Sequence, residues 1–407
     1  MKAKNSNINR RNILPFILII ILICLYILRH TINRQFNPVK DTTNTNNVIE
    51  RTTTVKPKKT RLIAAGDFIA HDALNLQAKN AQGKYNYLQF MDQMKPILAS
   101  GDIRFCNQST LVGGEQFGVS GYPSFNAPEA FASDMVGVGC NLINTASNHS
   151  SDKNQATIDA NVAIWQKLQG TLTVSGQNSS NEGKQRVNYF VMDGLKYAFL
   201  AYTTYTNSSP PTSYGVNMYT REFAATQIAT AKAAGAQFII VSMRWGTEYS
   251  QGVNGYQQSE SQYLSDLGVK LILGHGPHVL EPVKILKGTG GNETLVWYSL
   301  GNFLHAQLEA ETLFNGLAVI EIDPKTATIT SSSFLPTYMH YDWSVDEAQR
   351  QDLLARKNFE LVSIEKAPDL FKKAHLNTTI DAQEARINST LNKFTTIPII
   401  SLKDLSL

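Results

Sequence analysis

Short apolar runs alternate with longer amphipathic stretches along most of this chain of 407 residues. Nearly continuous apolar character, typical of strands buried on both faces, marks residues 61–68, 103–107, 141–147, 238–245 and 270–275. Helical spacing marks residues 154–170, 221–236 and 256–268, and the last two stretches close at glycine. The alternation predicts an α/β domain whose helices cover a sheet.

A second pattern, with apolar and polar positions alternating at a period of two, covers residues 186–203 and 283–336. Asp193-Gly194 within the first of these is a hairpin turn signal. We therefore expect antiparallel strands mixed with parallel ones. Beyond about residue 345 the sequence predicts helix and irregular chain, so that residues 61–340 form the main domain and residues 341–407 an extension.

The N-terminal region differs from the rest of the chain. Residues 13–28 are apolar and uncharged, with Lys2, Lys4, Arg10 and Arg11 before them and Arg29 and Arg34 after them. No small-residue cleavage site follows, which favours an uncleaved transmembrane signal anchor. The stronger basic cluster predicts that residues 1–12 are cytoplasmic and that the bulk of this single-pass cell membrane protein is extracytoplasmic. Polar residues 29–60 are expected to form a linker.

Composition narrows the classes of partner. The chain is 43% hydrophobic and 17% charged, with a net charge of +4, and no long basic run follows residue 60, which argues against nucleic acid as a partner. Cys24, Cys106 and Cys140 form no disulfide framework, and we expect Cys106 and Cys140 to be buried small apolar groups rather than a bridge.

Polar side chains follow several of the predicted buried strands. Ligands of open α/β sheets gather outside the carboxyl ends of strands, so side chains far apart in sequence can meet there. The candidates are Asp67, His71, Asp102, Asn107, Gln108, Asn148, His149, Asp152, Arg244, Glu248, His275, His278 and Asn302.

The segment GHGPHV, residues 274–279, holds two histidines three positions apart. Imidazole nitrogen together with carboxylate and amide oxygen suits a divalent ion such as manganese, zinc or iron. The pair alone is weak evidence, but with the strand-end residues it predicts a metal site. The ligand candidates are Asp67, His71, Asn148, His275 and His278, with Asp102 and Gln108 as additional ones.

Several candidates have an equally ordinary structural interpretation. Asp102 can cap a turn, and Asn302 can hold its loop through backbone hydrogen bonds. Trp245 and Tyr249 can pack in the core or at a rim. The remaining histidines, His30, His305, His340 and His375, have no partner in the sequence and are expected at the surface.

From about residue 61 to residue 320, the order GD…H, GD…NQ, NH…D, WGTEY, GHGPHV and YSLGNF resembles the CapA family of poly-γ-glutamate capsule biosynthesis proteins, in the calcineurin-like metallophosphatase group. The resemblance implies a four-layer α/β sandwich with mixed sheets, preceded by a transmembrane helix. It also implies a role in making or exporting an anionic γ-linked glutamate polymer, with capsule-synthesis membrane proteins as partners.

By the same resemblance, the five ligand candidates match metal-binding positions. His149, with Asp152 beside it, matches the residue that orients or protonates the leaving group in metallophosphatases. Arg244 and Glu248 fall in the WGTEY segment and are the remaining candidates for a catalytic role.

The chain departs from the family pattern at three positions. Gln108 stands where the family usually has glutamate, Arg244 where it usually has histidine, and Gly276 where it usually has the first histidine of GHHPH. Exchanging a carboxylate for an amide and an imidazole for a permanent cation makes the site more positive by roughly one to two charges, which weakens binding of dications. We therefore expect one divalent ion or none rather than two.

Three functions remain open. The first is a membrane-anchored capsule biosynthesis or export protein whose cleft binds an anionic polymer or a phosphorylated precursor, with Arg244 holding a carboxylate or phosphate. The second is a divalent-metal-dependent phosphoesterase in which His149 protonates the departing oxygen. The third is a metal-free binding or scaffold domain.

Overall fold

The computed structural model describes residues 58–374 and 376–407. The predicted anchor at 13–28 and nearly all of the predicted linker lie outside the described residues, as do His30 and His375. Within the described part of the chain, no helix is both long enough and apolar enough to cross a bilayer.

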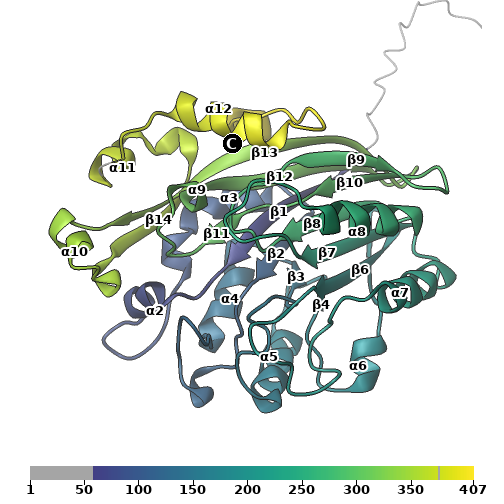
Figure 1. The fold of residues 1–407 in the computed structure, drawn as a ribbon, viewed down its shortest axis with the longest axis horizontal. Coiled ribbons are helices and arrows are strands. Elements are labelled where there is room, and N and C mark those ends of the chain that lie inside the picture. Colours follow the sequence, from purple (N-terminus) through teal and green to yellow (C-terminus); the bar gives the residue numbers. More distant parts are fainter. Residues whose placement is uncertain (1–57, 375) are drawn as a thin grey trace, which may run out of the picture. The chain divides into compact units, whose positions relative to one another are not determined.

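Two mixed β-sheets form the centre of the domain (Figure 1). Sheet 1 has the order β14-β13-β12-β1-β2-β3-β4, with β11 also paired to β1, and sheet 2 has the order β5-β6-β7-β8-β10-β9. The strands of sheet 1 are β1 (Thr60–Phe68), β2 (Ile103–Gln108), β3 (Leu142–Asn144), β4 (Thr173–Ser175), β11 (Asn302–Leu304), β12 (Phe314–Asp323), β13 (Thr328–Asp342) and β14 (Lys357–Ser363). Those of sheet 2 are β5 (Asn188–Met192), β6 (Leu195–Thr203), β7 (Phe238–Arg244), β8 (Leu271–His275), β9 (Val283–Lys287) and β10 (Glu293–Trp297).

Side chains of β1 show why the domain has four layers. Leu62 and Ala64 belong to the apolar core shared by the two sheets, whereas Ile63 and Ala65 belong to the core under the helices of sheet 1. Because successive side chains of a strand point to opposite faces, a strand that is apolar at every position is buried on both. The structure therefore has the helix, sheet, sheet and helix layers that the family resemblance implies.

Helices cover the outer face of each sheet. Sheet 1 carries α2 (Asp72–Ala78), α3 (Lys95–Ala99), α4 (Glu129–Val138) and α5 (Gln155–Lys167), and sheet 2 carries α7 (Arg221–Ala233) and α8 (Gly255–Asp266). The short helix α6 (Asn181–Gln185) precedes β5. The helical stretches predicted from spacing correspond to α5, α7 and α8, and Gly235 and Gly268 follow α7 and α8 with φ angles of 80° and 83°.

The predicted hairpin joins β5 to β6. Met192 pairs with Leu195, and the two residues between them, Asp193 and Gly194, have φ angles of 49° and 80°. Two successive positive φ angles are the geometry of a type I′ turn, which explains the Asp-Gly sequence.

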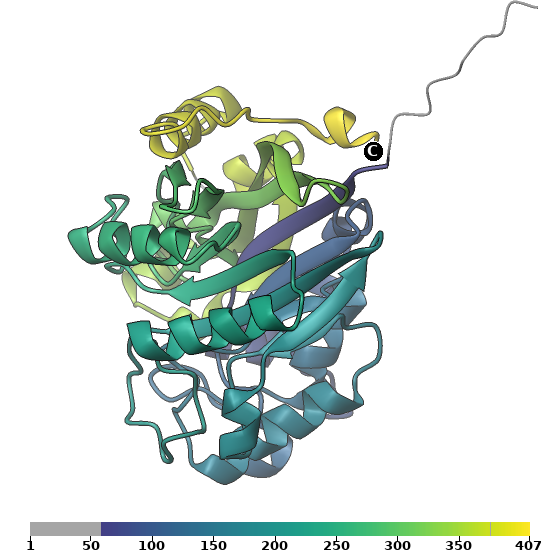
Figure 2. The ribbon, with the colours of Figure 1, turned by 90° about the vertical axis from the view of Figure 1, so that its right-hand side faces the viewer.

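The C-terminal segment contributes more to the fold than its sequence pattern predicts. Strand β14 pairs with β13 at the edge of sheet 1. Helix α12 (Ile380–Leu391) and Ile397 complete the core between the two sheets. In Figures 1 and 2, α12 lies in yellow on the side of the sheets away from α5 and α6. The remaining helices of this region are α9 (Ala310–Leu313), α10 (Val345–Gln349) and α11 (Pro368–Lys373).

Two further expectations were wrong. Cys106 and Cys140 are both buried, as expected, but they form a disulfide with Cα atoms 5.8 Å apart. Strand β2 and the turn before β3 bring the two residues together although 34 positions separate them, and sequence spacing carries no trace of this. His305 and His340 are buried, 0% and 2% exposed, instead of lying at the surface.

Candidate functional site

One polar residue stands at corresponding positions of neighbouring strands in sheet 1, and strand pairing brings these residues into a row. Asp67 near the end of β1 pairs with Asn107 of β2 on one side and Asn302 of β11 on the other. Asn107 pairs in turn with Asn144 of β3. This arrangement agrees with the expectation that polar groups gather at the carboxyl ends of the parallel strands.

His275, at the end of β8, joins the two sheets. Its ring is fully buried, and its Nδ1 lies 2.9 Å from Nδ2 of Asn107. Its Nε2 lies 3.0 Å from Nδ2 of Asn144 and 2.9 Å from Oγ of Ser242. Burial lowers the pKa of His275 to about 4, so its ring is neutral near pH 7. We call Asp67, Asn107, Asn144, His275, His278 and Asn302 the strand-end cluster.

His278 contacts the other side of Asp67. Its Nδ1 lies 3.1 Å from Oδ2 of Asp67 and 3.0 Å from Oδ1 of Asn302, and Asn107 donates to Oδ1 of Asp67 over 2.5 Å. Burial alone would raise the pKa of Asp67, but the interaction with His278 and the hydrogen bond from the Asn107 amide hold it below its ordinary value. Asp67 is therefore a buried carboxylate whose ionised form is stabilised by its neighbours.

His149 and Asp152 form a pair in the loop after β3. Nδ1 of His149 lies 2.6 Å from Oδ2 of Asp152, which also accepts the backbone N–H of Phe125. Nε2 of His149 lies 3.3 Å from Nδ2 of Asn207. The neighbouring Asn148 contacts the same residue, because its Nδ2 lies 3.4 Å from Oδ1 of Asn207. A carboxylate that accepts from Nδ1 leaves Nε2 as the nitrogen available to a ligand.

Arg244 ends β7 and pairs with His275 across the sheet. Its side chain is 0% exposed, donates from Nη2 to Oε1 of Glu248 over 2.9 Å, and lies with Cζ 4.0 Å from the ring centroid of Tyr205. Its Nε and Nη1 have no hydrogen-bond partner among the described residues. A buried guanidinium with two donor nitrogens that lack partners among the described residues is costly for the folded state.

Gly276 makes room for this guanidinium. Its φ angle is 112°, and a Cβ atom there would lie 2.8 Å from the carbonyl oxygen of Trp245 and 2.9 Å from Nε of Arg244. A side chain at position 276 would therefore collide with Arg244 as it lies here.

His71 lies apart from the strand-end cluster in its hydrogen bonding. Its Nδ1 accepts the backbone N–H of Ala306 over 3.1 Å, and its ring meets Phe125 edge-on. Burial lowers the pKa of His71 to about 3, with further lowering by the charges of Arg356, His278 and His149. Because Nδ1 is the acceptor, Nε2 of the neutral ring carries the proton, and His71 offers no lone pair to a metal in this arrangement.

Two additional ligand candidates lie elsewhere. Asp102 precedes β2 at the opposite end from Asn107, roughly 16 Å away along the strand, and accepts the backbone N–H of Arg61. Gln108 points toward α5, where it accepts from Nε1 of Trp165 and donates to the backbone carbonyl of Thr110. The structure therefore places neither of them with the cluster.

The rim residues differ from one another. Trp245 is fully buried and donates to the carbonyl of Tyr298, so it belongs to the core. Tyr249 is 47% exposed, with its ring centroid 5.9 Å from that of His278, so it borders the cluster.

Sequence reasoning missed Asn144 of the cluster, Ser242 that contacts it, and Asn207 that contacts Asn148 and His149. Asn144 and Ser242 stand in buried apolar strands, where a polar residue at 0% exposure has to find a partner. That signal was present in the sequence. Asn207 sits in an irregular loop after β6 and carried no such signal.

The resemblance implies a divalent metal, which the donor chemistry can test. Among the described residues, no group of three or more His, Cys, Asp or Glu side chains is placed to hold a metal ion. Both ring nitrogens of His275 already face Asn107, Asn144 and Ser242, and Arg244 brings a permanent charge to the adjoining strand end. These donors therefore do not fit a pair of divalent cations.

Comparison with known proteins agrees with the resemblance. The family model described as bacterial capsule synthesis protein PGA_cap matches residues 61–307. The chain belongs to this family. Two curated relatives carry the CapA name, the PGA biosynthesis protein CapA of Bacillus subtilis, 30% identical over 169 residues, and the capsule biosynthesis protein CapA of Bacillus anthracis, 22% identical over 215 residues.

The matches to these CapA relatives are partial. They cover 41% and 49% of this chain and 43% and 51% of the two relatives, so the chain matches about half the length of each. A solved calcineurin-like phosphoesterase of Bacillus subtilis is also similar, with a TM-score of 0.40 and 11% identity over 80% of this chain and 99% of that one.

Proposed function

We propose that this member of the PGA_cap family is a capsule biosynthesis or export protein that binds an anionic polymer, or a phosphorylated precursor, beside its strand-end cluster. The family supplies the process, because the matching model and both curated relatives carry capsule or PGA synthesis in their names. Arg244 supplies the chemistry of binding, since a guanidinium is the side chain best suited to carboxylate and phosphate oxygens.

The observation that carries this proposal is the state of Arg244. Its contact with Glu248 engages Nη2 alone, while Nε and Nη1 stay buried without partners. An oxyanion that reached either group would add a charge-assisted hydrogen bond and remove the cost of the unpaired donor. Tyr205 is 38% exposed and stacks on the guanidinium, so we expect it to border the ligand.

A binding measurement with the full-length protein tests this proposal. The probe is a fluorescent linear γ-glutamate oligomer, followed by anisotropy at low and moderate salt. We expect saturable binding that Arg244→Gln weakens by about tenfold or more. Arg221→Gln is the matched control, because Arg221 lies in the same domain and donates through Nε and Nη2 to both oxygens of Glu260. Equal affinity of the Arg244 variant and the wild type would refute the role of Arg244.

We also propose that the cluster holds at most one divalent cation. Nδ1 of His278 lies 3.1 Å from Oδ2 of Asp67 and 3.0 Å from Oδ1 of Asn302, and a single cation would take these three side chains as ligands. It would supply a second positive charge for the anionic ligand. Titration of the full-length protein with manganese should give a stoichiometry of one or none, reduced in Asp67→Asn, and two tightly bound ions would contradict the proposal.

Localisation follows from the anchor and the disulfide. We propose that residues 13–28 hold the protein in the cell membrane, where capsule-synthesis membrane proteins are its partners, with the domain on the extracytoplasmic side. The Cys106–Cys140 bridge supports this, because disulfides persist in oxidising compartments. An impermeant protease added to cells whose wall has been removed should degrade the domain, and full protection would contradict the placement.

A metal-dependent phosphoesterase is the alternative, and the His149–Asp152 pair favours it. An imidazole held by a carboxylate at Nδ1 is arranged to give or take a proton at Nε2. This alternative predicts turnover of a chromogenic phosphodiester with added manganese that is lost in His149→Ala and kept in His340→Asn. No turnover above the rate of the His149 variant would exclude it.

A further inference from the structure

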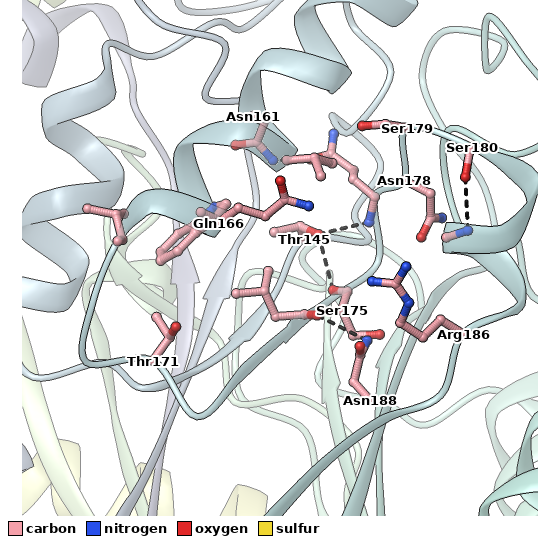
Figure 3. Close-up of a pocket in the computed structure, with 16 residues that line it drawn as sticks. Thr145, Asn161, Gln166, Thr171, Ser175, Asn178, Ser179, Ser180, Arg186 and Asn188 are labelled. Carbon is pink, nitrogen blue, oxygen red and sulfur yellow. Dashed lines mark hydrogen bonds between the residues drawn. The ribbon is translucent and has the colours of Figure 1, made fainter. Parts of the chain in front are cut away.

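A polar pocket of about 350 Å³ opens at the outer edge of sheet 1 (Figure 3). Helix α5 forms one wall, and the segment after β4, with residues up to the start of β5, forms the other. Thr145 follows β3 and Ser175 ends β4, so the pocket also lies at strand carboxyl ends, where α/β proteins bind ligands. Its volume is within the range of small-ligand sites.

The lining is polar but carries a single charged residue. Primary amides dominate it, with Asn161, Gln166, Gln177, Asn178 and Asn188, together with several hydroxyl groups. No aspartate, glutamate, lysine or histidine lines the pocket, and Arg186 is its single charged residue. The pocket therefore carries one positive charge in a neutral wall that both donates and accepts hydrogen bonds.

Two polar groups that line the pocket have no hydrogen-bond partner in the part of the chain that the structure describes. Arg186 and Gln166 are both exposed, and within the described residues neither the guanidinium of Arg186 nor the amide of Gln166 makes a hydrogen bond or ion pair. In Figure 3 the guanidinium points into the same space as Asn178 and Asn188, and Gln166 reaches in from α5 on the other side.

The buried part of the wall is rigid. Asn178 donates to Oδ1 of Asn217 and to the carbonyl of Tyr214, and Asn188 donates to the carbonyl of Val174, which leaves the carbonyl oxygens of both amides available. These fixed amide acceptors are preorganised, which lowers the cost of binding, whereas the exposed guanidinium of Arg186 would be ordered by the ligand itself.

The geometry points to a second subsite for the ligand of this protein: we infer that the pocket binds one unit of an amide-linked acidic chain. Arg186 would pair with its carboxylate, and the wall amides would pair with its amide N–H and C=O. A sugar fits less well, because the lining offers no carboxylate acceptor and buries Trp165 at 3% exposure. The inference rests on the proposed function for the source of such a chain.

The position of the pocket fits a chain that passes from one subsite to the other. Ser175 pairs with Asn144 of the strand-end cluster, and three strand spacings, about 14 Å, separate β4 from β1. Gln177 also donates to the carbonyl of Ser150 over 2.6 Å, and Ser150 adjoins His149. The pocket wall is thus bonded to the loop that carries the His149–Asp152 pair.

Calorimetric titration of the full-length protein with γ-glutamylglutamate, and with a decamer of the same linkage, tests the subsite. We expect the dipeptide to bind the wild type, Arg186→Gln to weaken that binding about tenfold or more, and Gln166→Ala to weaken it less. Arg350→Gln is the control, since Arg350 is an exposed arginine paired to Asp346 in α10. Binding of the decamer should be weakened by both Arg186→Gln and Arg244→Gln.

The outcomes separate this inference from the proposed function. Decamer binding that depends on Arg244 but not on Arg186 would overturn the subsite and leave the proposed function standing. No binding of either ligand would overturn both. A third outcome is that Arg186→Gln weakens binding of the dipeptide but leaves binding of the decamer unchanged. The pocket would then bind free short peptides, and the polymer subsite would be overturned.

Discussion

Two groups on the sheet 2 side of the domain each hold an arginine, a glutamate and a tyrosine, and they differ in how the arginine is paired. Arg221, at the start of α7, donates from Nε and Nη2 to both oxygens of Glu260 in α8, which also accepts from Tyr219. Arg244 makes one bond to Glu248, and its Nε and Nη1 have no partner in the described part of the chain. Arg221 is 47% exposed, whereas Arg244 is 0% exposed.

This fold therefore tolerates the free-energy cost of unpaired polar groups at a buried position. Within the described residues, the exposed arginine is paired through two nitrogens to both oxygens of its glutamate, although water could have replaced missing partners, whereas the buried arginine is paired through one nitrogen only. Within the described residues, other buried atoms without partners include Oδ2 of Asp67 and Oδ1 of Asp152 near the strand ends, while Nε1 of Trp297 and Nη1 of Arg386 are among those that lie elsewhere.

The largest expected effect concerns Glu281, three residues after His278. Burial raises the pKa of Glu281 to about 8, from an ordinary value of 4.5. Its stabilising contribution is present below pH 4.5 and is lost as the pH rises toward 8, by about 4 kcal/mol between pH 5 and pH 8. Urea unfolding at the two pH values should show this loss in the wild type and a much smaller one in Glu281→Gln. An equal loss of unfolding free energy in the wild type and in Glu281→Gln would show that the buried Glu281 carboxylate does not destabilise this region.

The next effect tests the fit between Gly276 and Arg244. We expect Gly276→Ala to destabilise the protein by about 3 kcal/mol, because the new Cβ atom meets Trp245 and Arg244 and the φ angle is 112°. Gly291→Ala is the control, since its φ angle is 79° and nothing lies within 4 Å, and it should cost about 1 kcal/mol. A similar loss of unfolding free energy in both variants would mean that a Cβ atom at position 276 fits beside Arg244 without a clash.

A smaller effect of opposite sign is expected at Arg244 itself. Arg244→Met removes a buried charge with two unpaired donors and leaves behind Glu248, whose side chain is 39% exposed and can be solvated. We expect the free energy of unfolding to rise by about 2 kcal/mol while anion binding falls. A loss of stability would show that Arg244 is structural, like Arg221.

The smallest effect is expected at Arg221. Burial acts to raise the pKa of Glu260, but hydrogen bonds from Arg221, Tyr219 and Ser259 outweigh it and keep that pKa below its ordinary value. The contribution of this pairing is present above the unfolded pKa and is lost as the pH falls through the folded one. Arg221→Gln should therefore be slightly less stable than the wild type near pH 7 and match it in acid, with unchanged anion binding. A stability difference that persisted in acid would point to packing instead.

Much of the fold followed from local pattern. The buried strands, the helices that close at glycine and the Asp193-Gly194 hairpin are each set by residues within a few positions of one another, which a single sequence displays. Strand β14 and the disulfide depend on partners far away in the chain, and nothing near Lys357 or Cys106 indicates them.

The candidate site, like the fold, could be predicted from the sequence only in part. The order of motifs placed Asp67, His275 and His278 together, because each directly follows or ends a buried strand. It could not show that Gln108 turns toward α5, since adjacent residues of a strand point to opposite faces and one position decides which faces the cluster. Nor could it show that Nδ1 of His71 is occupied by a backbone N–H.

The strand order of sheet 1 determines which strands can pair before synthesis of the chain is complete. Strand β1 lies between β2, which follows it closely, and β12, which begins at residue 314, and Ile397 still belongs to the core between the sheets. A chain that emerges from its N-terminus first can build β1 to β4 early, yet it has no complete inner layer until nearly four hundred residues have been delivered. The apolar faces of the early strands would therefore stay uncovered until the last part of the chain has been made.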